Sequence, residues 1–134
     1  MTLYLDSSAL VAAVIDGRNR QMVLDAMDTD LEWCSSALAL AEALALVPRL
    51  TEEDVLRTDL EDALRLLWDH LAVVPVDQGC LDAATRIARD QPVRMGDAIH
   101  LAAADRLPRP LRFVTLDPAQ IPVALSMGFD VVSA

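Results

Sequence analysis

The sequence predicts an α/β fold in which a central, mostly parallel sheet lies between two layers of helices. Short apolar segments of strand length alternate with longer segments of helical periodicity along the whole chain. Hydrophobic residues make up 54% of the chain and charged residues 24%, which is typical of a globular protein with a sizeable core. At 134 residues the chain fits one compact domain, spanning 1–134.

Predicted strands and helices follow one another in order. The strands are short and apolar, and they are expected at 2–6, 31–35, 72–76, 111–116 and 129–133. The helices are expected at 7–16, 20–27, 36–48, 51–71, 77–90, 96–107 and 118–128. In such a parallel sheet, ligands bind beyond the carboxyl ends of the strands.

Terminal residues justify the helix boundaries. The first helix has a Ser start and ends before Gly17, while the third begins at the capping residue type Ser36 and ends near Pro48. The fourth, "TEEDVLRTDLEDALRLLWDHL", combines an acidic first turn with leucines at three- and four-residue spacing. It is therefore expected to be long and amphipathic.

Composition excludes several function classes. The net charge of −10 disfavours a partner bound mainly by long-range attraction to phosphate. All eleven basic residues are Arg, so a Walker A loop and a phospho-accepting receiver domain, which both rely on Lys, are excluded. Cys34 and Cys80 form no metal-binding spacing and are expected to be buried thiols. With neither a signal peptide nor a membrane span in the sequence, we expect a cytoplasmic protein.

A solvated stripe of surface charges does not explain the positions of four acidic residues. Asp6 and Asp117 lie at the carboxyl ends of two predicted strands, which meet at one edge of a parallel sheet. Asp97 opens a helix on its apolar side, and Glu42 is the only charged residue in "ALALAEALALV". Singly, each Asp has an alternative role as a helix N-cap, and Glu42 as the partner of a buried Arg. A hard divalent cation would satisfy all four together.

Four segments resemble, in order, the motif blocks of the PIN domain: "LYLDSSALVAAV", "SSALALAEAL", "GDAIHLAAA" and "RFVTLDPAQIPVALSMGFDVV". The resemblance extends over essentially the whole chain, whose size resembles that of the VapC toxins of bacterial toxin-antitoxin pairs. The resemblance implies a three-layer α/β/α fold and a Mg²⁺- or Mn²⁺-dependent endoribonuclease. It also implies inactivation by a cognate antitoxin and, usually, a homodimer.

The resemblance also implies roles for individual residues. The catalytic, metal-binding acids would be Asp6, Glu42, Asp97 and Asp117, of which Asp117 is the more variable. Ser8 would support the first acid, and Thr115 matches the polar residue two before the last. Clustered carboxylates suit this activity because a metal ion that they hold lowers the pKa of bound water for in-line attack on a phosphodiester.

Other residues carry weaker signals. Arginines in predicted loops or near strand ends are candidates for contact with an RNA backbone: Arg18, Arg20, Arg94 and Arg112. A solvated surface Arg is the alternative for each. His100, one turn after Asp97, is expected to be a packed histidine bonded to a neighbour rather than a general base.

Two alternative functions stay open. A haloacid-dehalogenase-like phosphatase also places an Asp after its first strand, but it should have a second Asp where this chain has Ser8. A degenerate PIN-like module could keep the fold and partner binding without catalysis, although all four acids are present. Metal-dependent cleavage of RNA separates these possibilities.

Overall fold

The structure is a computed structural model that describes residues 1–30 and 32–134. Within this range the strands are β1 (Thr2–Leu5), β2 (Glu32–Ser36), β3 (Ala72–Val74), β4 (Leu111–Val114) and β5 (Asp130–Val132). The helices are α1 (Ser7–Val14), α2 (Arg20–Thr29), α3 (Ala37–Leu50), α4 (Asp54–Trp68), α5 (Gln78–Asp90), α6 (Met95–Asp105) and α7 (Ile121–Ser126). Every predicted element is present, although residue 31, the predicted start of the second strand, lies outside the described residues.

The sheet confirms the predicted parallel arrangement. Its strand order is β3-β2-β1-β4-β5, and all four neighbouring pairs are parallel. The chain builds outward from β1 to β3 on one side and then returns to add β4 and β5 on the other. The direction of winding therefore reverses beside β1. Sheets of this class bind ligands at the carboxyl ends of the strands where the winding reverses, which here is the carboxyl end of β1.

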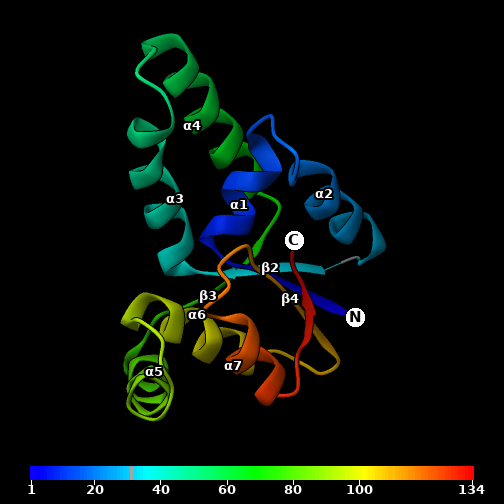
Figure 1. The fold of residues 1–134 in the computed structure, drawn as a ribbon, viewed down its shortest axis with the longest axis vertical. Helices are drawn as coiled ribbons and strands as arrows, with labels where there is room; N and C mark the ends of the chain where they lie inside the picture. The colour runs from blue at the N-terminus through cyan, green and yellow to red at the C-terminus, as the bar shows by residue number, and fades with distance from the viewer. Residues whose placement is uncertain (31) are drawn as a thin grey trace.

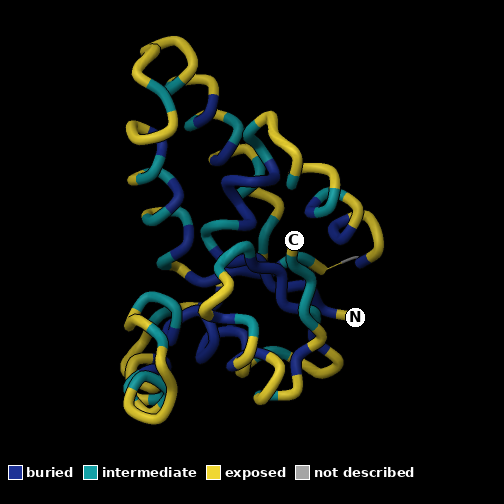
Figure 2. The backbone as a smooth tube through the Cα atoms, in the orientation of Figure 1, coloured by how far each residue is buried: buried dark blue, intermediate teal, exposed yellow. Residues whose placement is uncertain are grey.

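Helices cover both faces of the sheet, which gives the three-layer α/β/α architecture. In Figure 1, α1 to α4 lie on one side of the sheet and α5 to α7 on the other. Successive residues of β1 point to opposite faces, so Leu3 and Leu5 pack with the first helical layer and Tyr4 with the second. Figure 2 shows that buried residues concentrate in the central strands and in the helix faces turned towards them. Cys34 and Cys80 are buried and free, as predicted.

Helix ends differ from the predictions for local reasons. The helix α3 runs past Pro48 to Leu50. A proline in the last turn removes only one intrahelical hydrogen bond, and the Arg57 side chain donates to the carbonyls of Pro48 and Thr51 at the helix end (Nη2–O 3.2 Å and Nε–O 2.7 Å). Ser36 does occupy the N-cap position of α3, but its hydroxyl makes no capping hydrogen bond.

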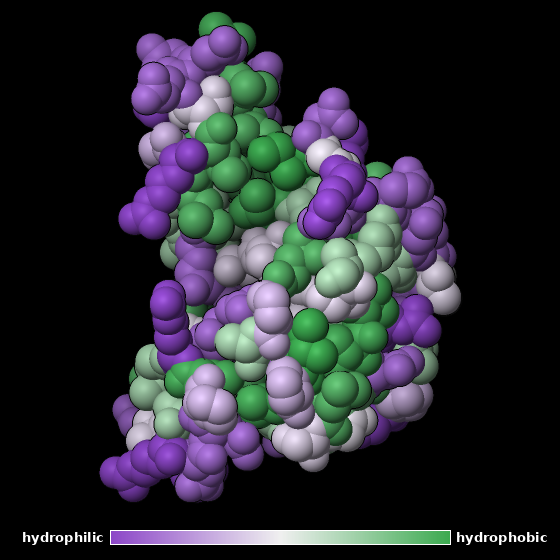
Figure 3. All heavy atoms as spheres, in the orientation of Figure 1, coloured by the Kyte–Doolittle hydropathy of each residue, from purple (hydrophilic) through white to green (hydrophobic). Residues whose placement is uncertain are grey.

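The hairpin of α3 and α4 extends away from the sheet, and its tip is exposed (Figures 1 and 2). Figure 3 shows apolar side chains gathered over the neighbouring surface of α1, α3 and α4. A hollow in this part of the molecule is lined by Val14, Ile15, Leu50, Leu56 and Leu60, among others.

Among the described residues, no helix is long and apolar enough to cross a membrane.

Candidate metal and active site

Asp6 lies at the junction of the two central strands. It follows β1 directly, and its backbone N–H donates to the carbonyl of Val114 at the end of β4 (3.3 Å). Its side chain is only 1% exposed and caps α1 by accepting a hydrogen bond from the N–H of Ala9 (2.9 Å). Burial raises the pKa of the Asp6 carboxyl, and hydrogen bonds oppose that shift. The cap predicted as an alternative to metal binding is therefore present, but it uses only one oxygen.

Two hydroxyl groups hold the Asp6 carboxylate. Ser8 Oγ donates to Oδ1 and Thr115 Oγ1 donates to Oδ2, both at 2.6 Å. Each hydroxyl also accepts a backbone hydrogen bond from the segment after β4: Ser8 from Leu116 (2.9 Å) and Thr115 from Asp117 (3.0 Å). These contacts fix the direction of both hydroxyl hydrogens towards Asp6. This geometry agrees with the supporting role that is expected of Ser8 and Thr115.

Asp97 approaches Asp6 from the first turn of α6. A single nitrogen, Nε2 of Gln120, donates to Asp6 Oδ2 (3.1 Å) and to Asp97 Oδ1 (3.0 Å). The pKa of Asp97 is raised first by burial and then by the neighbouring Asp117 carboxyl. Asp117 caps no helix, because α7 begins only at Ile121; its Oδ1 accepts from the N–H of Ala119 in a turn (3.0 Å). These three Asp side chains therefore lie close together.

Glu42 reaches the same region from α3 and is bound by a histidine. His100 Nε2 lies 2.5 Å from Glu42 Oε1, and Nδ1 of the same ring lies 2.7 Å from the hydroxyl of Tyr4. His100 is 1% exposed, so it is the packed, neighbour-bonded histidine that the sequence predicts. A Cβ atom added at Gly96 would lie 3.1 Å from Glu42 Oε2, which places the second oxygen beside the residue that precedes Asp97.

The donor set fits a hard divalent cation. Asp6, Asp97 and Asp117 would supply carboxylate oxygens, the ligands that Mg²⁺ and Mn²⁺ prefer. Burial is the main cause of the raised pKa of Asp97, and the neighbouring Asp117 carboxyl, whose repulsion such an ion would relieve, adds to it. Over residues 1–30 and 32–134, no three His, Cys, Asp or Glu side chains converge closely enough to chelate an ion as they stand. Other side chains contact the acids instead: Gln120 bridges two of them, and His100 holds Glu42.

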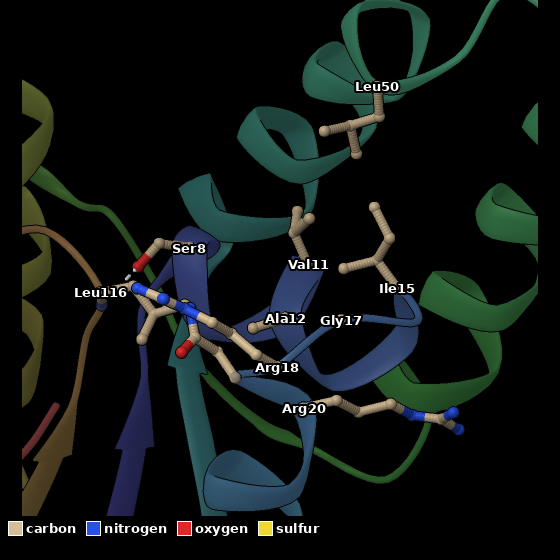
Figure 4. Close-up of a pocket in the computed structure, with 10 residues that line it drawn as sticks. Ser8, Val11, Ala12, Ile15, Gly17, Arg18, Arg20, Leu50 and Leu116 are labelled. Carbon is tan, nitrogen blue, oxygen red and sulfur yellow. Dashed lines mark hydrogen bonds between the residues drawn. The ribbon is translucent and has the colours of Figure 1, made fainter. Parts of the chain in front are cut away.

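The four arginine candidates lie in three places. Arg18 and Arg20 line a pocket of about 170 Å³ that Ser8 and Leu116 also line. In Figure 4 the Arg18 side chain extends towards Leu116, whereas Arg20 points away from the pocket. Arg94 is exposed at the N-cap of α6, three residues before Asp97.

Arg112 is not brought to the acids. It lies near the amino end of β4, and its guanidinium is 3.6 Å from Asp30 and 3.8 Å from Asp130, which lie at the amino ends of β2 and β5. Its expected contact with RNA therefore has no geometric support, because the acids occupy the opposite edge of the sheet.

A sequence profile described as the PIN domain matches residues 3–124. The chain belongs to the PIN domain family. The matched range contains all four acids and both hydroxyl groups that hold Asp6. Membership sets aside the phosphatase alternative, since Ser8 holds Asp6 where that class needs a second Asp. No curated protein matches the sequence.

Solved structures share this PIN fold at low sequence identity. VapBC2 from Rickettsia felis, bound to a promoter DNA fragment, has a TM-score of 0.72 and 12% identity, with 100% of this chain and 99% of that chain covered. DNA-bound VapBC from Salmonella typhimurium has a TM-score of 0.71 and 15% identity, covering 99% and 98%. VapBC-5 from Mycobacterium tuberculosis has a TM-score of 0.66 and 18% identity, covering 100% of both chains.

Three side-chain contacts of this PIN domain are not predictable from the sequence: those of Tyr4 with His100, of His100 with Glu42, and of Gln120 with two of the acids. A glutamine near a helix start and a tyrosine in an apolar strand are ordinary residues, so nothing local marks them. The only available signal was strand alternation, which turns Tyr4 to the face opposite Leu3 and Leu5, where α6 packs.

Proposed function

We propose that this chain is a metal-dependent endoribonuclease of the VapC type, the toxin of a toxin-antitoxin pair. The observation that carries the proposal is the gathering of Asp6, Glu42, Asp97 and Asp117 from four separate segments beside the carboxyl ends of β1 and β4. Like charges collected in this way destabilise a fold unless they bind something positive. Carboxylate ligands suit metal-assisted hydrolysis of a phosphodiester, in which water attacks and no protein nucleophile is needed.

Each part of the site has a distinct task in this mechanism. When bound to the acids, Mg²⁺ or Mn²⁺ lowers the pKa of water and neutralises charge on the scissile phosphate. Asp6 is held rigidly by Ser8 and Thr115, so it would present a fixed ligand oxygen. Glu42, anchored through one oxygen by His100, keeps its second oxygen available to ligate or to orient the attacking water. Arg18 lines the pocket together with Ser8, and its proposed task is to contact the RNA backbone.

Metal dependence tests the function. We expect the purified chain to cleave a mixed RNA pool in millimolar Mn²⁺ or Mg²⁺ and to lose this activity when EDTA is added. We also expect Mn²⁺ to raise the melting temperature, because an ion bound only by the folded state stabilises it by mass action. Ca²⁺ and buffer alone serve as controls for cleavage. RNA hydrolysis that persists in excess EDTA, or a melting curve unmoved by millimolar Mn²⁺, would reject the proposed centre.

A cognate antitoxin is the proposed partner, since the similar solved structures include toxin-antitoxin complexes. The net charge of −10 favours a partner that inserts an Arg among the acids. The apolar surface of α1, α3 and α4 offers it a place to pack, and the pocket in Figure 4 joins Leu50 and Ile15 to Ser8 (Figures 3 and 4). We therefore propose that the antitoxin runs from this surface to the acids.

The candidate antitoxin is the product of any small reading frame found next to the gene, and it provides the test. It should co-purify with the chain and block RNA cleavage. Leu56→Glu, which charges an exposed residue of the apolar surface (42% exposed), should relieve that block while unliganded cleavage stays normal. Leu81→Glu on α5 (36% exposed) is the matched control and should leave inhibition intact. Equal inhibition of all three proteins would contradict this docking surface.

Two expectations from the resemblance complete the proposal. A homodimer is expected from the resemblance alone, and sedimentation equilibrium of the isolated chain tests it. A cytoplasmic location agrees with two free cysteines, and fractionation of cells carrying the chain tests it.

A further inference from the structure

Gln120 occupies a central position between two of the acids. Its side chain is 2% exposed and reaches in from the N-cap position of α7. An amide NH₂ group carries two hydrogens, and here the same nitrogen donates to Asp6 Oδ2 and Asp97 Oδ1. The amide is therefore located where an ion shared by these two carboxylates would lie.

The carboxylate of Asp6 has no acceptor capacity left. An ionised carboxylate offers about four lone-pair positions, two on each oxygen. Oδ1 accepts from Ser8 and from the N–H of Ala9, and Oδ2 accepts from Thr115 and Gln120. The first three donors are fixed by the α1 cap or by backbone hydrogen bonds to Ser8 and Thr115. Only Gln120 can leave Asp6 by side-chain rotation without disturbing the strand ends.

The carbonyl oxygen of the Gln120 side chain indicates how strongly the two carboxylates orient the amide. Its carbonyl oxygen, Oε1, is buried and has no hydrogen-bond partner among residues 1–30 and 32–134. An unpaired buried acceptor destabilises a fold, so the two hydrogen bonds to carboxylates must outweigh this cost. Reversing the amide would place its oxygen against both acids. The amide has no net charge, however, so it leaves the repulsion among the acids unrelieved.

We propose that the Gln120 amide is a built-in substitute for the cation: it bridges Asp6 and Asp97 in the metal-free protein, and a divalent ion must displace it to bind. The inference rests on the proposed metal site. It makes Gln120 a positioning residue that keeps the two carboxylates together before metal arrives. It also means that apparent metal affinity is lower than the bare acids would give, because binding includes the loss of two hydrogen bonds.

The test compares wild type with Gln120→Met, which removes the amide at similar length and flexibility. Without metal, the variant should melt at least about 4 °C below wild type because two charge-assisted hydrogen bonds are lost. As Mn²⁺ is added, this deficit should shrink, and the half-saturating Mn²⁺ concentration should fall at least about three-fold relative to wild type. Gln78→Met, which removes an exposed amide–carboxylate bond to Asp82, is the control and should leave that concentration unchanged.

Other outcomes overturn the inference in distinguishable ways. A deficit that stays constant at all Mn²⁺ concentrations would make Gln120 a structural residue only. A deficit that grows with Mn²⁺ would make its carbonyl a metal ligand. In both cases Mn²⁺ still stabilises wild type, so the proposed site would stand; if wild type shows no Mn²⁺ shift, the site itself fails.

A second measurement does not depend on a folded variant. In ¹⁵N-labelled wild type, the buried Gln120 side-chain NH₂ should exchange slowly with water. Titration with diamagnetic Mg²⁺ should shift its resonances and accelerate its exchange as the amide leaves the carboxylates. Unchanged Gln120 resonances, in a titration that moves the backbone resonances of Asp6 and Asp97, would refute displacement.

Discussion

Asp97→Asn is expected to reduce RNA cleavage by at least about 1,000-fold while the metal-free protein keeps its fold. The substitution removes one charge at nearly constant volume, and the Asn carbonyl can still accept the hydrogen bond from Gln120. Burial and Asp117 raise the pKa of the Asp97 carboxyl, so its ionised form destabilises the folded state at neutral pH. The variant should therefore melt slightly above metal-free wild type, and this advantage should disappear as pH falls through the raised pKa.

The other acids should respond according to their contacts. Glu42→Gln should also abolish cleavage and still fold, because its amide oxygen can accept from His100. Asp117→Asn should be milder in activity, since Asn supports the same turn to Ala119. Asp6→Asn should lose both activity and stability, because an amide NH₂ would face at least one of the four donors around Asp6.

Single-turnover cleavage and melting temperature, measured on the same preparations, check these expectations. Asp62→Asn, an exposed acid on α4, is the control for loss of one negative charge and should behave like wild type. A fully active Asp97→Asn protein would refute the metal site. A destabilised but fully active Glu42→Gln protein would identify Glu42 as a structural partner of His100 only.

Phe113→Ala is expected to cost about 3–5 kcal/mol of unfolding free energy, the largest stability effect among our predictions. Phe113 is fully buried on β4 and stacks between Tyr4 (centroids 5.3 Å apart) and Phe129 (5.8 Å). Truncation leaves a cavity and removes two aromatic contacts. A domain of this kind has only about 5–15 kcal/mol in total, so the melting temperature should fall by on the order of 10 °C.

The same stack supports the site, because Tyr4 hydrogen-bonds to His100, which holds Glu42. Urea unfolding of Phe113→Ala and of Phe113→Leu separates cavity formation from loss of the aromatic ring. The Leu variant retains most of the volume and should lose only about 1–2 kcal/mol. A loss below about 1 kcal/mol for Phe113→Ala would show that the stack does not anchor this layer.

The sequence by itself determined the layers and the edge of the sheet that carries the site. Alternation in β1 assigns Leu3 and Leu5 to one face and Tyr4 to the other, and helical spacing assigns the apolar sides of α3 and α4. An Asp at the end of each of two parallel strands is sufficient to bring Asp6 and Asp117 to one rim. These features follow from backbone periodicity and strand direction, which act over a few residues and can be read locally.

Only the tertiary structure decided which side chains pair. His100, the partner of Glu42, lies 58 residues away in sequence, and the Gln120 amide lies 114 residues from Asp6. The pairing of Arg112 with Asp30 and Asp130, at the edge opposite the acids, likewise joins segments that are far apart in the sequence or lie on separate strands. Such contacts depend on how helices cross the sheet and on the reach of individual rotamers. Sequence spacing carries no information about either, because each contact joins elements that meet only when the whole chain has packed.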